Sequence, residues 1–282
     1  NTRSRGLGDV YKRQNLDMAD NFIGKNALIT GASSGIGKDI AYIMAEKGIN
    51  LILLARREDN LIKIKEDIQE KFSIKIMVIA ADLSQIPEYE RIYDECKRND
   101  LMPDFLVNNA GYGTLDSFHK ISYEDHIKFI NVLSTSVVSL TQLFIQNMIS
   151  NGFGRIINIA SLAGFAPASN SGGMYTAVKS MVIKFSEGIH KEYKDNNIYC
   201  CAVCPGFTHT EFHDQMGEFK SSIPSFMWMN SKTVAKQAFD ETMKGKDLYI
   251  NGGINKFLAF LMWLTPKWLT NLYYKLIMRK RP

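Results

Sequence analysis

The chain has 282 residues, of which 45% are apolar, and a formal net charge of +5. This length and composition suffice for one large hydrophobic core, and no Pro- or Ser-rich linker divides the chain, so we expect a single domain. The first fourteen residues hold four basic residues and one acidic residue, and without them the net charge is +2. Basic patches with interleaved aromatic residues are also absent from the sequence, so we expect no nucleic-acid partner.

Residues 1–17 differ in character from the rest of the chain. The run from Asp9 to Gln14 resembles the translated end of an adapter used in library preparation, so we interpret residues 1–17 as a non-native or disordered leader and Met18 as the first native residue. The segment after Met18 carries Asp20, Asn21 and Lys25 and has no early apolar stretch. We therefore expect no secretory signal and a cytoplasmic protein.

Residues 26–30 form a short apolar run that ends in a glycine-rich turn, Gly31-Ala-Ser-Ser-Gly35-Ile-Gly37. Apolar residues then recur at helical spacing up to Gly48, so the segment predicts a strand, a turn and a helix. Unpaired N–H groups at the start of a helix attract anions, and glycine lets a pyrophosphate come close to the backbone. The turn therefore indicates a phosphate site, although its G-x-x-x-G-x-G pattern differs from the commoner fingerprint and leaves an ordinary tight turn as the alternative.

Further apolar runs occur at intervals, with a helical stretch between each and the next. They occupy residues 51–54, 76–79, 105–107, 155–160 and 199–203. Continuous apolar strands that alternate with helices indicate a parallel sheet covered on both faces. Cys201 and Cys204 have C-x-x-C spacing within the last run, but no second pair accompanies them, so we interpret them as reduced cysteines of a buried strand.

Ser161, Tyr175 and Lys179 have spacings that suit proton transfer. Ser161 comes directly after the strand predicted over residues 155–160, and in open α/β sheets ligands bind at the carboxyl ends of the strands. If a helix begins near Gly172 and Gly173, Tyr175 and Lys179 share one helical face. An ammonium group within ~4–6 Å of a phenol lowers the phenol pKa from about 10, so we expect Lys179 to tune Tyr175 toward neutral pH. A Tyr-x-x-x-Lys pair alone also occurs by chance on amphipathic helices.

Taken in order, these motifs resemble those of the short-chain dehydrogenase/reductase family, from about Gly24 to Thr210. The resemblance implies an α/β fold of the Rossmann type, a doubly wound parallel sheet with helices on both faces, formed by residues 18–253. The family's cofactor-binding motifs match the residues Gly31, Ser33, Ser34, Gly35, Ile36, Gly37, Asp82, Leu83, Asn109, Ala110, Gly111, Pro205, Gly206, Thr208 and Thr210, and its catalytic tetrad matches Asn131, Ser161, Tyr175 and Lys179. One departure is an interval between Ser161 and Tyr175 that is one residue longer than usual, with a bulge expected at Asn170 to Gly173.

The resemblance implies hydride transfer between a nicotinamide cofactor and a carbonyl or alcohol. The hydroxyls of Ser161 and Tyr175 would stabilise negative charge on a carbonyl oxygen, and Tyr175 would deliver the proton. Lys179 would also bind the nicotinamide ribose, and Asn131 would hold a water that links Lys179 to solvent. Without the motif order, a helix asparagine bonded to local backbone is the simpler interpretation of Asn131.

Two arginines come after the strand at residues 51–54, where NAD sites usually have an acidic residue. Ala55 replaces that acid, and an arginine suits a 2′-phosphate, so we predict NADP(H) with Arg56 as the chief contact. The alternative is that Arg56 and Arg57 are solvated residues at the start of a helix.

Bulky residues border the predicted pocket, which favours an apolar substrate with Phe207 as a contact. The other residues of this kind are Tyr112, Leu162, Phe165 and the run 226–229. They could equally fill the core or a subunit interface. His209 and His213 lie nearby without a third ligand at suitable spacing, so we expect no metal. The substrate class is then a 3-oxoacyl group or a steroid-like or aliphatic ketone, and a catalytically silent NADP(H)-sensing protein is the alternative function.

Residues 254–282 form an apolar segment that ends in basic residues. Pro266 interrupts the apolar run before it is long enough to span a bilayer. We expect a helical extension that covers the pocket or packs on a partner subunit, and a peripheral membrane contact is the alternative. The family resemblance implies a homodimer or homotetramer.

Overall fold

Seven strands form one parallel sheet in the computed structural model, which describes residues 22–113, 117–166, 173–214 and 223–265. The strands lie in the order β3-β2-β1-β4-β5-β6-β9. Their bounds are β1 (Asn26–Thr30), β2 (Asn50–Ala55), β3 (Ile76–Ala80), β4 (Phe105–Asn108), β5 (Gly154–Ile159), β6 (Ile198–Cys204) and β9 (Leu248–Ile250). The order reverses between β1 and β4, and a ligand crevice forms at such a switch point. The predicted α/β fold, a Rossmann-type doubly wound sheet, is confirmed.

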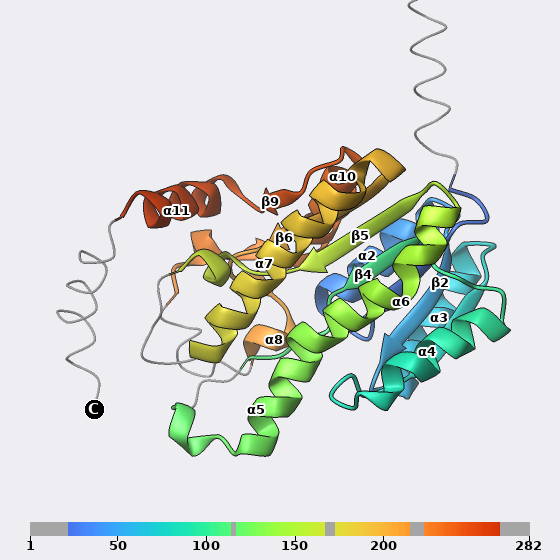
Figure 1. Cartoon of the computed structure of the whole chain (residues 1–282), viewed down its shortest axis with the longest axis horizontal. Helices are drawn as coiled ribbons and strands as arrows, with labels where there is room; N and C mark the ends of the chain where they lie inside the picture. Colours follow the sequence, from blue (N-terminus) through green and yellow to red (C-terminus); the bar gives the residue numbers. More distant parts are fainter. Residues whose placement is uncertain (1–21, 114–116, 167–172, 215–222, 266–282) are drawn as a thin grey trace, which may run out of the picture.

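Helices cover both faces of the sheet (Figure 1). One face is covered by α2 (Gly35–Glu46), α3 (Glu58–Lys71) and α10 (Ser231–Met243), and the other by α4 (Pro87–Arg98), α6 (Ser136–Ser150) and α7 (Gly173–Tyr193). Each face has its own apolar core, because the inner strands are buried on both sides. Shorter elements near the carboxyl ends of the strands are η1 (Phe118–Lys120), α5 (Tyr123–Ile130), η2 (Asn131–Thr135), η3 (Leu162–Phe165), β7 (Thr208–His209), α8 (Glu211–Asp214), η5 (Ser225–Met227) and β8 (Met229–Asn230), and η4 (Lys194–Asn196) precedes β6.

The seventh strand, β9, was not among the strands predicted from the sequence. It has three residues, Leu248–Ile250, and all three are only partly buried. It completes the sheet by pairing with the end of β6. The six predicted strands are all present, with ends that differ from the predicted ones by at most two residues.

One helical run in the described part of the chain, residues 123–150, is long and apolar enough to cross a membrane by length and composition. It comprises α5, η2 and α6, and half of its most apolar window is buried inside the protein. Leu140 and Phe144 of this run are fully buried in the core. Burial against the sheet accounts for its apolar composition.

The four cysteines are Cys96 of α4 and Cys200, Cys201 and Cys204 of β6, and all are buried and free of disulfides. Burial raises the pKa of the Cys96 and Cys201 thiols to about 12. The interpretation of the C-x-x-C pair as reduced residues of a buried strand is confirmed. Among the described residues, no group of His, Cys, Asp and Glu has the arrangement of a metal site.

The C-terminal helix α11 (Gly253–Leu264) begins one residue before the predicted extension and lies at the edge of the molecule (Figure 1). Asn255 and Ala259 are its buried residues, and the helix contacts η3. Its other face is apolar and exposed, with the side chains of Ile254, Phe257, Phe260, Leu261, Trp263 and Leu264. The predicted leader, residues 1–17, and the end of the predicted extension, residues 266–282, lie outside the described residues.

Candidate active site

The turn between β1 and α2 is tied to the end of β4. Thr30 Oγ1 accepts hydrogen bonds from the backbone N–H groups of Asn109 at 2.9 Å and Ala110 at 3.0 Å. Asn109 Nδ2 donates to the backbone oxygens of Thr30 at 3.0 Å and Gly31 at 3.2 Å. The Asn109 side chain, predicted as a cofactor contact, therefore also fixes the shape of the glycine turn.

Two glycines make this close approach possible. Gly31 has a φ of +65°, in the left-handed region that favours glycine. A Cβ atom at Gly37 would lie 2.4 Å from Asn109 Nδ2 and 2.6 Å from the Gly31 oxygen. The next helix, α2, has Ser34 as its N-cap, and the Ser34 side chain makes no capping hydrogen bond. The first N–H groups of α2 thus keep their capacity to bind a phosphate, so the turn fits a dinucleotide.

Arg57 is bonded to the glycine turn, whereas the predicted chief contact of the cofactor was Arg56. Arg57 Nη2 donates to Ser33 Oγ at 3.1 Å, to Ser34 Oγ at 3.0 Å and to Glu211 Oε2 at 2.7 Å. Arg56 is exposed and lines the same cavity as Arg57. The cavity is thus lined by two guanidinium groups and two serine hydroxyls, together with the Glu211 carboxylate that pairs with Arg57.

Ser161, Tyr175 and Lys179 come together at the end of β5, as predicted. Ser161 lies just beyond the end of β5, and α7 begins at Gly173 and brings Tyr175 and Lys179 to the same cavity. The Ser161 and Tyr175 side chains are hydrogen-bonded to each other. Lys179 is buried, and its Nζ donates to the Ile159 backbone oxygen at 2.7 Å and lies 5.8 Å from the centroid of the Tyr175 ring. The predicted bulge at residues 170–173 lies largely outside the described residues, which end at 166 and resume at 173.

The predicted lowering of the Tyr175 pKa is wrong. Burial raises the pKa of Tyr175 to about 12, and the hydrogen bond with Ser161 opposes this rise only in part. Burial lowers the pKa of Lys179 to about 8. The Lys179 amine bonds to the Ile159 carbonyl, so its charge does not dominate the environment of the phenol. Tyr175 is thus a protonated phenol at neutral pH.

Asn131 begins the π-helix η2, a distortion that is frequent at functional sites. Its Nδ2 donates to the Ser84 backbone oxygen at 2.9 Å, and its own backbone oxygen accepts from Tyr89 Oη at 3.3 Å. The side chain therefore joins η2 to the segment after β3 and does not bond to nearby helix backbone, which was the simpler interpretation of this residue. Asp82, in that same segment, accepts from the Ser84 N–H at 3.0 Å.

The segment after β6 closes the cavity, but with a different aromatic residue from the one predicted. Phe207 lies against Trp228, with ring centroids 5.6 Å apart, and is not part of the cavity lining. Phe212 of α8 lines the cavity instead, with its ring centroid 5.8 Å from that of Tyr175. No motif pointed to Phe212, because its position depends on the path of the chain beyond the Pro205-Gly206 turn.

One cavity of about 380 Å³ contains most of the predicted site. Of the predicted cofactor residues, only Gly37 is missing from its lining, where it supports the turn from behind. Asn131 and Phe207 are also outside the lining. Tyr112, predicted to border the pocket, is part of the lining. The lining residues that were not predicted as site residues are Leu54, Ala55, Arg57, Ala81, Val132, Ile159, Ala160, Glu211 and Phe212.

The chain is similar to known dehydrogenases and reductases. The short chain dehydrogenase family profile matches residues 25–221. The very-long-chain 3-oxoacyl-CoA reductase of Rattus norvegicus is 32% identical over 265 residues, which cover 91% of this chain and 79% of the relative. The 17-beta-hydroxysteroid dehydrogenase type 3 of the same organism is 30% identical, over 86% of this chain and 77% of the relative. A solved short-chain dehydrogenase from Sphingobium yanoikuyae in complex with NADPH superimposes with a TM-score of 0.74 and 25% identity, covering 86% of this chain and 97% of that one.

The fold, the glycine turn and the cavity define an oxidoreductase with a nicotinamide cofactor. The chain belongs to the short-chain dehydrogenase/reductase family. Its relatives are named as reductases and dehydrogenases, so the alternative of a catalytically silent sensing protein is not favoured.

Proposed function

We propose that this enzyme reduces the carbonyl of an apolar substrate with NADPH, and that the substrate is a 3-oxoacyl group. The observation that carries this is one cavity with a phosphate-binding turn and arginines at one end and Ser161, Tyr175 and Lys179 at the other. Tyr112, Val132 and Phe212 give the reactive end an apolar wall. The similarity to 3-oxoacyl-CoA reductases favours the acyl substrate over a steroid-like or aliphatic ketone.

A panel of ketones tests the proposal. The purified chain is mixed with NADPH and with 3-oxoacyl-CoA esters of increasing length, a steroid ketone and an aliphatic ketone, and NADPH absorbance is followed. We expect the turnover of 3-oxoacyl esters to exceed that of the other ketones. Turnover of none of them would contradict the proposed activity, and a preference for the steroid would contradict the substrate class.

When bound, NADPH supplies a hydride to the carbonyl carbon. The protein residues would do the rest: the hydroxyls of Ser161 and Tyr175, already hydrogen-bonded to each other, would donate to the carbonyl oxygen, and Tyr175 would transfer its proton to it. The ammonium form of Lys179 would place positive charge beside the phenol and bind the nicotinamide ribose. Asn131, whose amide is bonded to Ser84, would hold the geometry of η2 for proton resupply.

The pH dependence of reduction should report Lys179. Burial lowers the pKa of Lys179 to about 8, so its ammonium form is present below that pH and is lost above it. The pKa of Tyr175 is about 12, so the phenol stays protonated throughout. We expect kcat/KM for reduction to fall as the pH rises past about 8, measured between pH 6 and 10. A profile that is flat over this range would contradict the role given to Lys179.

Both arginines should select NADPH over NADH. A charge-assisted hydrogen bond contributes about 1.5–3 kcal/mol, so we expect Arg56→Ala and Arg57→Ala each to weaken NADPH binding by roughly 10- to 100-fold. The affinity for NADH, which lacks the 2′-phosphate, should change little. Fluorescence titration of both cofactors measures this, with Lys71→Ala as the control, because Lys71 is an exposed cation of α3 that pairs with Asp67. Equal losses for both cofactors would contradict NADP(H) selectivity.

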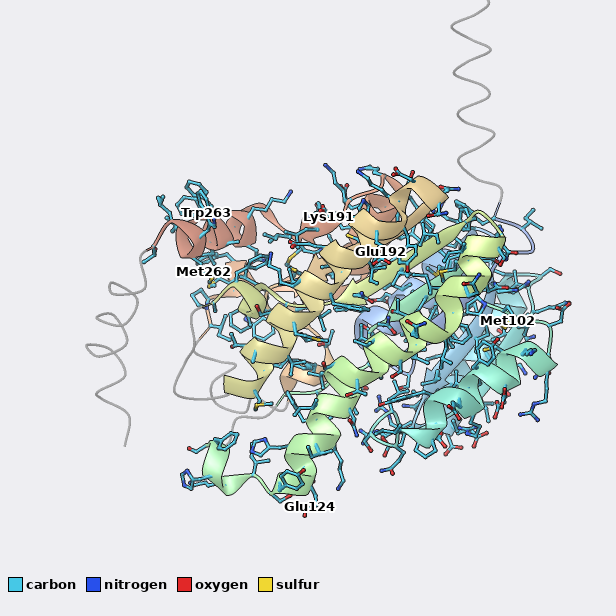
Figure 2. The ribbon with its side chains drawn as sticks, in the orientation of Figure 1. Met102, Glu124, Lys191, Glu192, Met262 and Trp263 are labelled. Carbon is cyan, nitrogen blue, oxygen red and sulfur yellow. The ribbon has the colours of Figure 1, made fainter. Side chains whose placement is uncertain are left out.

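We further propose a peripheral membrane contact through α11 and the chain beyond it. Phe257, Phe260 and Trp263 have exposed fractions of 60%, 52% and 79% on a helix whose single charge is Lys256. Figure 2 labels Trp263 at the outer surface of α11. The sequence beyond α11 adds Trp268 and five basic residues, Lys267, Lys275, Arg279, Lys280 and Arg281. Aromatic and basic residues together suit an anionic headgroup layer.

Vesicle binding tests this contact. We expect the full chain to sediment with vesicles that contain phosphatidylserine, and a variant with Phe257, Phe260 and Trp263 changed to Ser to remain in solution. The control carries Ser at Ile62 and Ile86, two exposed apolar residues on other elements. If both variants sediment like the unmodified chain, the membrane proposal is wrong. If the unmodified chain instead forms a dimer or tetramer that the triple variant cannot form, the exposed face is a subunit interface, as the predicted oligomer would require.

A further inference from the structure

A chain of buried polar side chains crosses the sheet beneath the reactive residues. Asn108 Nδ2, at the end of β4, donates to Asn158 Oδ1 of β5 at 2.8 Å. Asn158 Nδ2 donates to Ser186 Oγ of α7 at 2.8 Å, and Ser186 Oγ donates to the Val182 backbone oxygen at 2.7 Å. Asn158 and Ser186 are completely buried, and Asn108 is 5% exposed. Nothing in the proposed reaction uses these groups directly.

The position of this chain of bonds relates it to Lys179. Ser186 lies seven residues after Lys179, so both are on the face of α7 that meets the sheet. Asn158 immediately precedes Ile159, whose backbone oxygen accepts from Lys179 Nζ at 2.7 Å. The same helix is therefore attached to the same strand at two neighbouring points, once through the Lys179 amine and once through Ser186.

Asn158 Nδ2 also lies 3.5 Å from Cys200 Sγ of β6, a weak acceptor. The other contacts that surround these bonds are apolar and would not by themselves fix the position of the helix along the strand. Val182 and Ile183 of α7 pack with Ala202 and Cys204 of β6 in one apolar cluster. Apolar packing is non-directional, whereas a buried hydrogen bond between fixed partners admits one alignment. A small slide of α7 would move Lys179 away from the Ile159 carbonyl and Tyr175 away from Ser161.

We propose that Asn158 and Ser186 are positioning residues that hold α7 at the one alignment on β5 in which Lys179 and Tyr175 meet their partners. Asn108 extends the same alignment to β4, whose next residue, Asn109, fixes the glycine turn. The phosphate-binding turn and the proton-transfer residues thus share one buried polar connection. This inference rests on the proposed reductase function, because it assigns Lys179 and Tyr175 their roles.

The groups that face Lys179 decide what a change at Ser186 would do to its titration. Among the described residues they are the Tyr175 phenol on α7, the Cys204 thiol on β6 and the Ile159 carbonyl on β5. The carbonyl bond favours the ammonium form. Loss of the Ser186 bond should loosen that contact, and the pH at which Lys179 loses its proton should then fall.

The test compares Ser186→Ala with Thr141→Val in the full chain, using NADPH and the best ketone of the panel. Thr141 is a matched control, because it is 1% exposed and its Oγ1 donates to the carbonyl four residues earlier, at 2.7 Å, as Ser186 does. For Ser186→Ala we expect kcat to fall about tenfold. We also expect the pH above which the rate falls to be lower by about half a pH unit. The Kd of Ser186→Ala for NADPH should stay within about twofold of that of the unmodified enzyme. Thr141→Val should have the kcat and the pH–rate profile of the unmodified enzyme.

Other outcomes separate the inference from the proposed function. If the unmodified chain reduces no ketone, the proposed reductase function is wrong. If the unmodified chain is active and Ser186→Ala has the same kcat and the same pH–rate profile, only the positioning role is wrong. Equal changes in both variants would also overturn it, since loss of any buried hydroxyl would then suffice. If Ser186→Ala does not fold, Ser186→Cys is used instead, because its thiol is a weak hydrogen-bonding group. We expect its kcat, and the pH above which its rate falls, to be lower than in the unmodified enzyme but less so than expected for Ser186→Ala. If the rate of Ser186→Cys falls at the same pH as that of the unmodified enzyme, the positioning role of Ser186 is wrong.

Discussion

Changing Tyr175 to Phe should lower kcat for carbonyl reduction by roughly 10²–10⁴-fold, the usual contribution of a positioned general acid. Phe keeps the ring, and therefore its packing against Phe212, and removes only the hydroxyl that is bonded to Ser161. Stopped-flow measurement of NADPH oxidation at saturating ketone separates this chemical step from binding.

The Kd for NADPH supplies the control for this variant. The phosphate and arginine end of the cavity is formed by β1, α2 and β2, so Tyr175→Phe should bind NADPH within a few-fold of the unmodified chain. If the kcat of Tyr175→Phe is within tenfold of that of the unmodified chain, Tyr175 is not the proton donor. A large loss of NADPH binding would show that the variant disturbs the whole cavity.

Changing Gly37 to Ala should abolish cofactor binding and destabilise the fold. The added methyl group would lie 2.4 Å from Asn109 Nδ2 and 2.6 Å from the Gly31 oxygen, closer than real contacts allow. Forced overpacking typically costs about 1–3 kcal/mol, and relief would have to come from the turn that binds the phosphates. We expect a lower unfolding midpoint in urea and no measurable saturation with NADPH.

Gly188 of α7 offers a matched substitution. A methyl group there meets no atom within 4 Å, and the residue lies inside a helix. Gly188→Ala should stabilise the chain, by about 0.5–1 kcal/mol, and should leave the Kd for NADPH unchanged. If Gly37→Ala behaves like Gly188→Ala, the close contact at the glycine turn does not constrain the cofactor site.

The fold and the meeting of Ser161, Tyr175 and Lys179 at one cavity could be predicted from the sequence because both depend on local patterns. Buried parallel strands produce unbroken apolar runs, and six such runs correspond to six strands. Ser161 was placed by the strand before it, and Tyr175 and Lys179 by helical spacing, so their meeting at one cavity was a result of topology. The three-residue strand β9 was not predicted, because its partly buried residues form no unbroken apolar run.

The direction of side chains and the pKa values of buried groups could not be predicted from these sequence patterns. Neighbouring arginines look alike in sequence, yet only the direction of each side chain makes Arg57 the one that reaches Ser33 and Ser34. Phe212 replaced Phe207 in the cavity because the path after β6 is set by tertiary contacts. Burial raises the pKa of Tyr175, and helical spacing brings Lys179 near the ring without pairing its amine with the phenol oxygen.

The location of the four cysteines has a practical consequence for measuring the stability of this protein. Each sulfur is buried, three of them on β6, the neighbour of the edge strand β9, and the fourth on α4. An alkylating reagent can reach them only when that part of the chain opens, and the reaction needs the thiolate, which burial disfavours. Mass spectrometry of alkylated chains over time therefore reports how readily β6 and α4 open, with no engineered probe. Cofactor that binds the closed form would slow this labelling, so its protection can be quantified before any substrate is known.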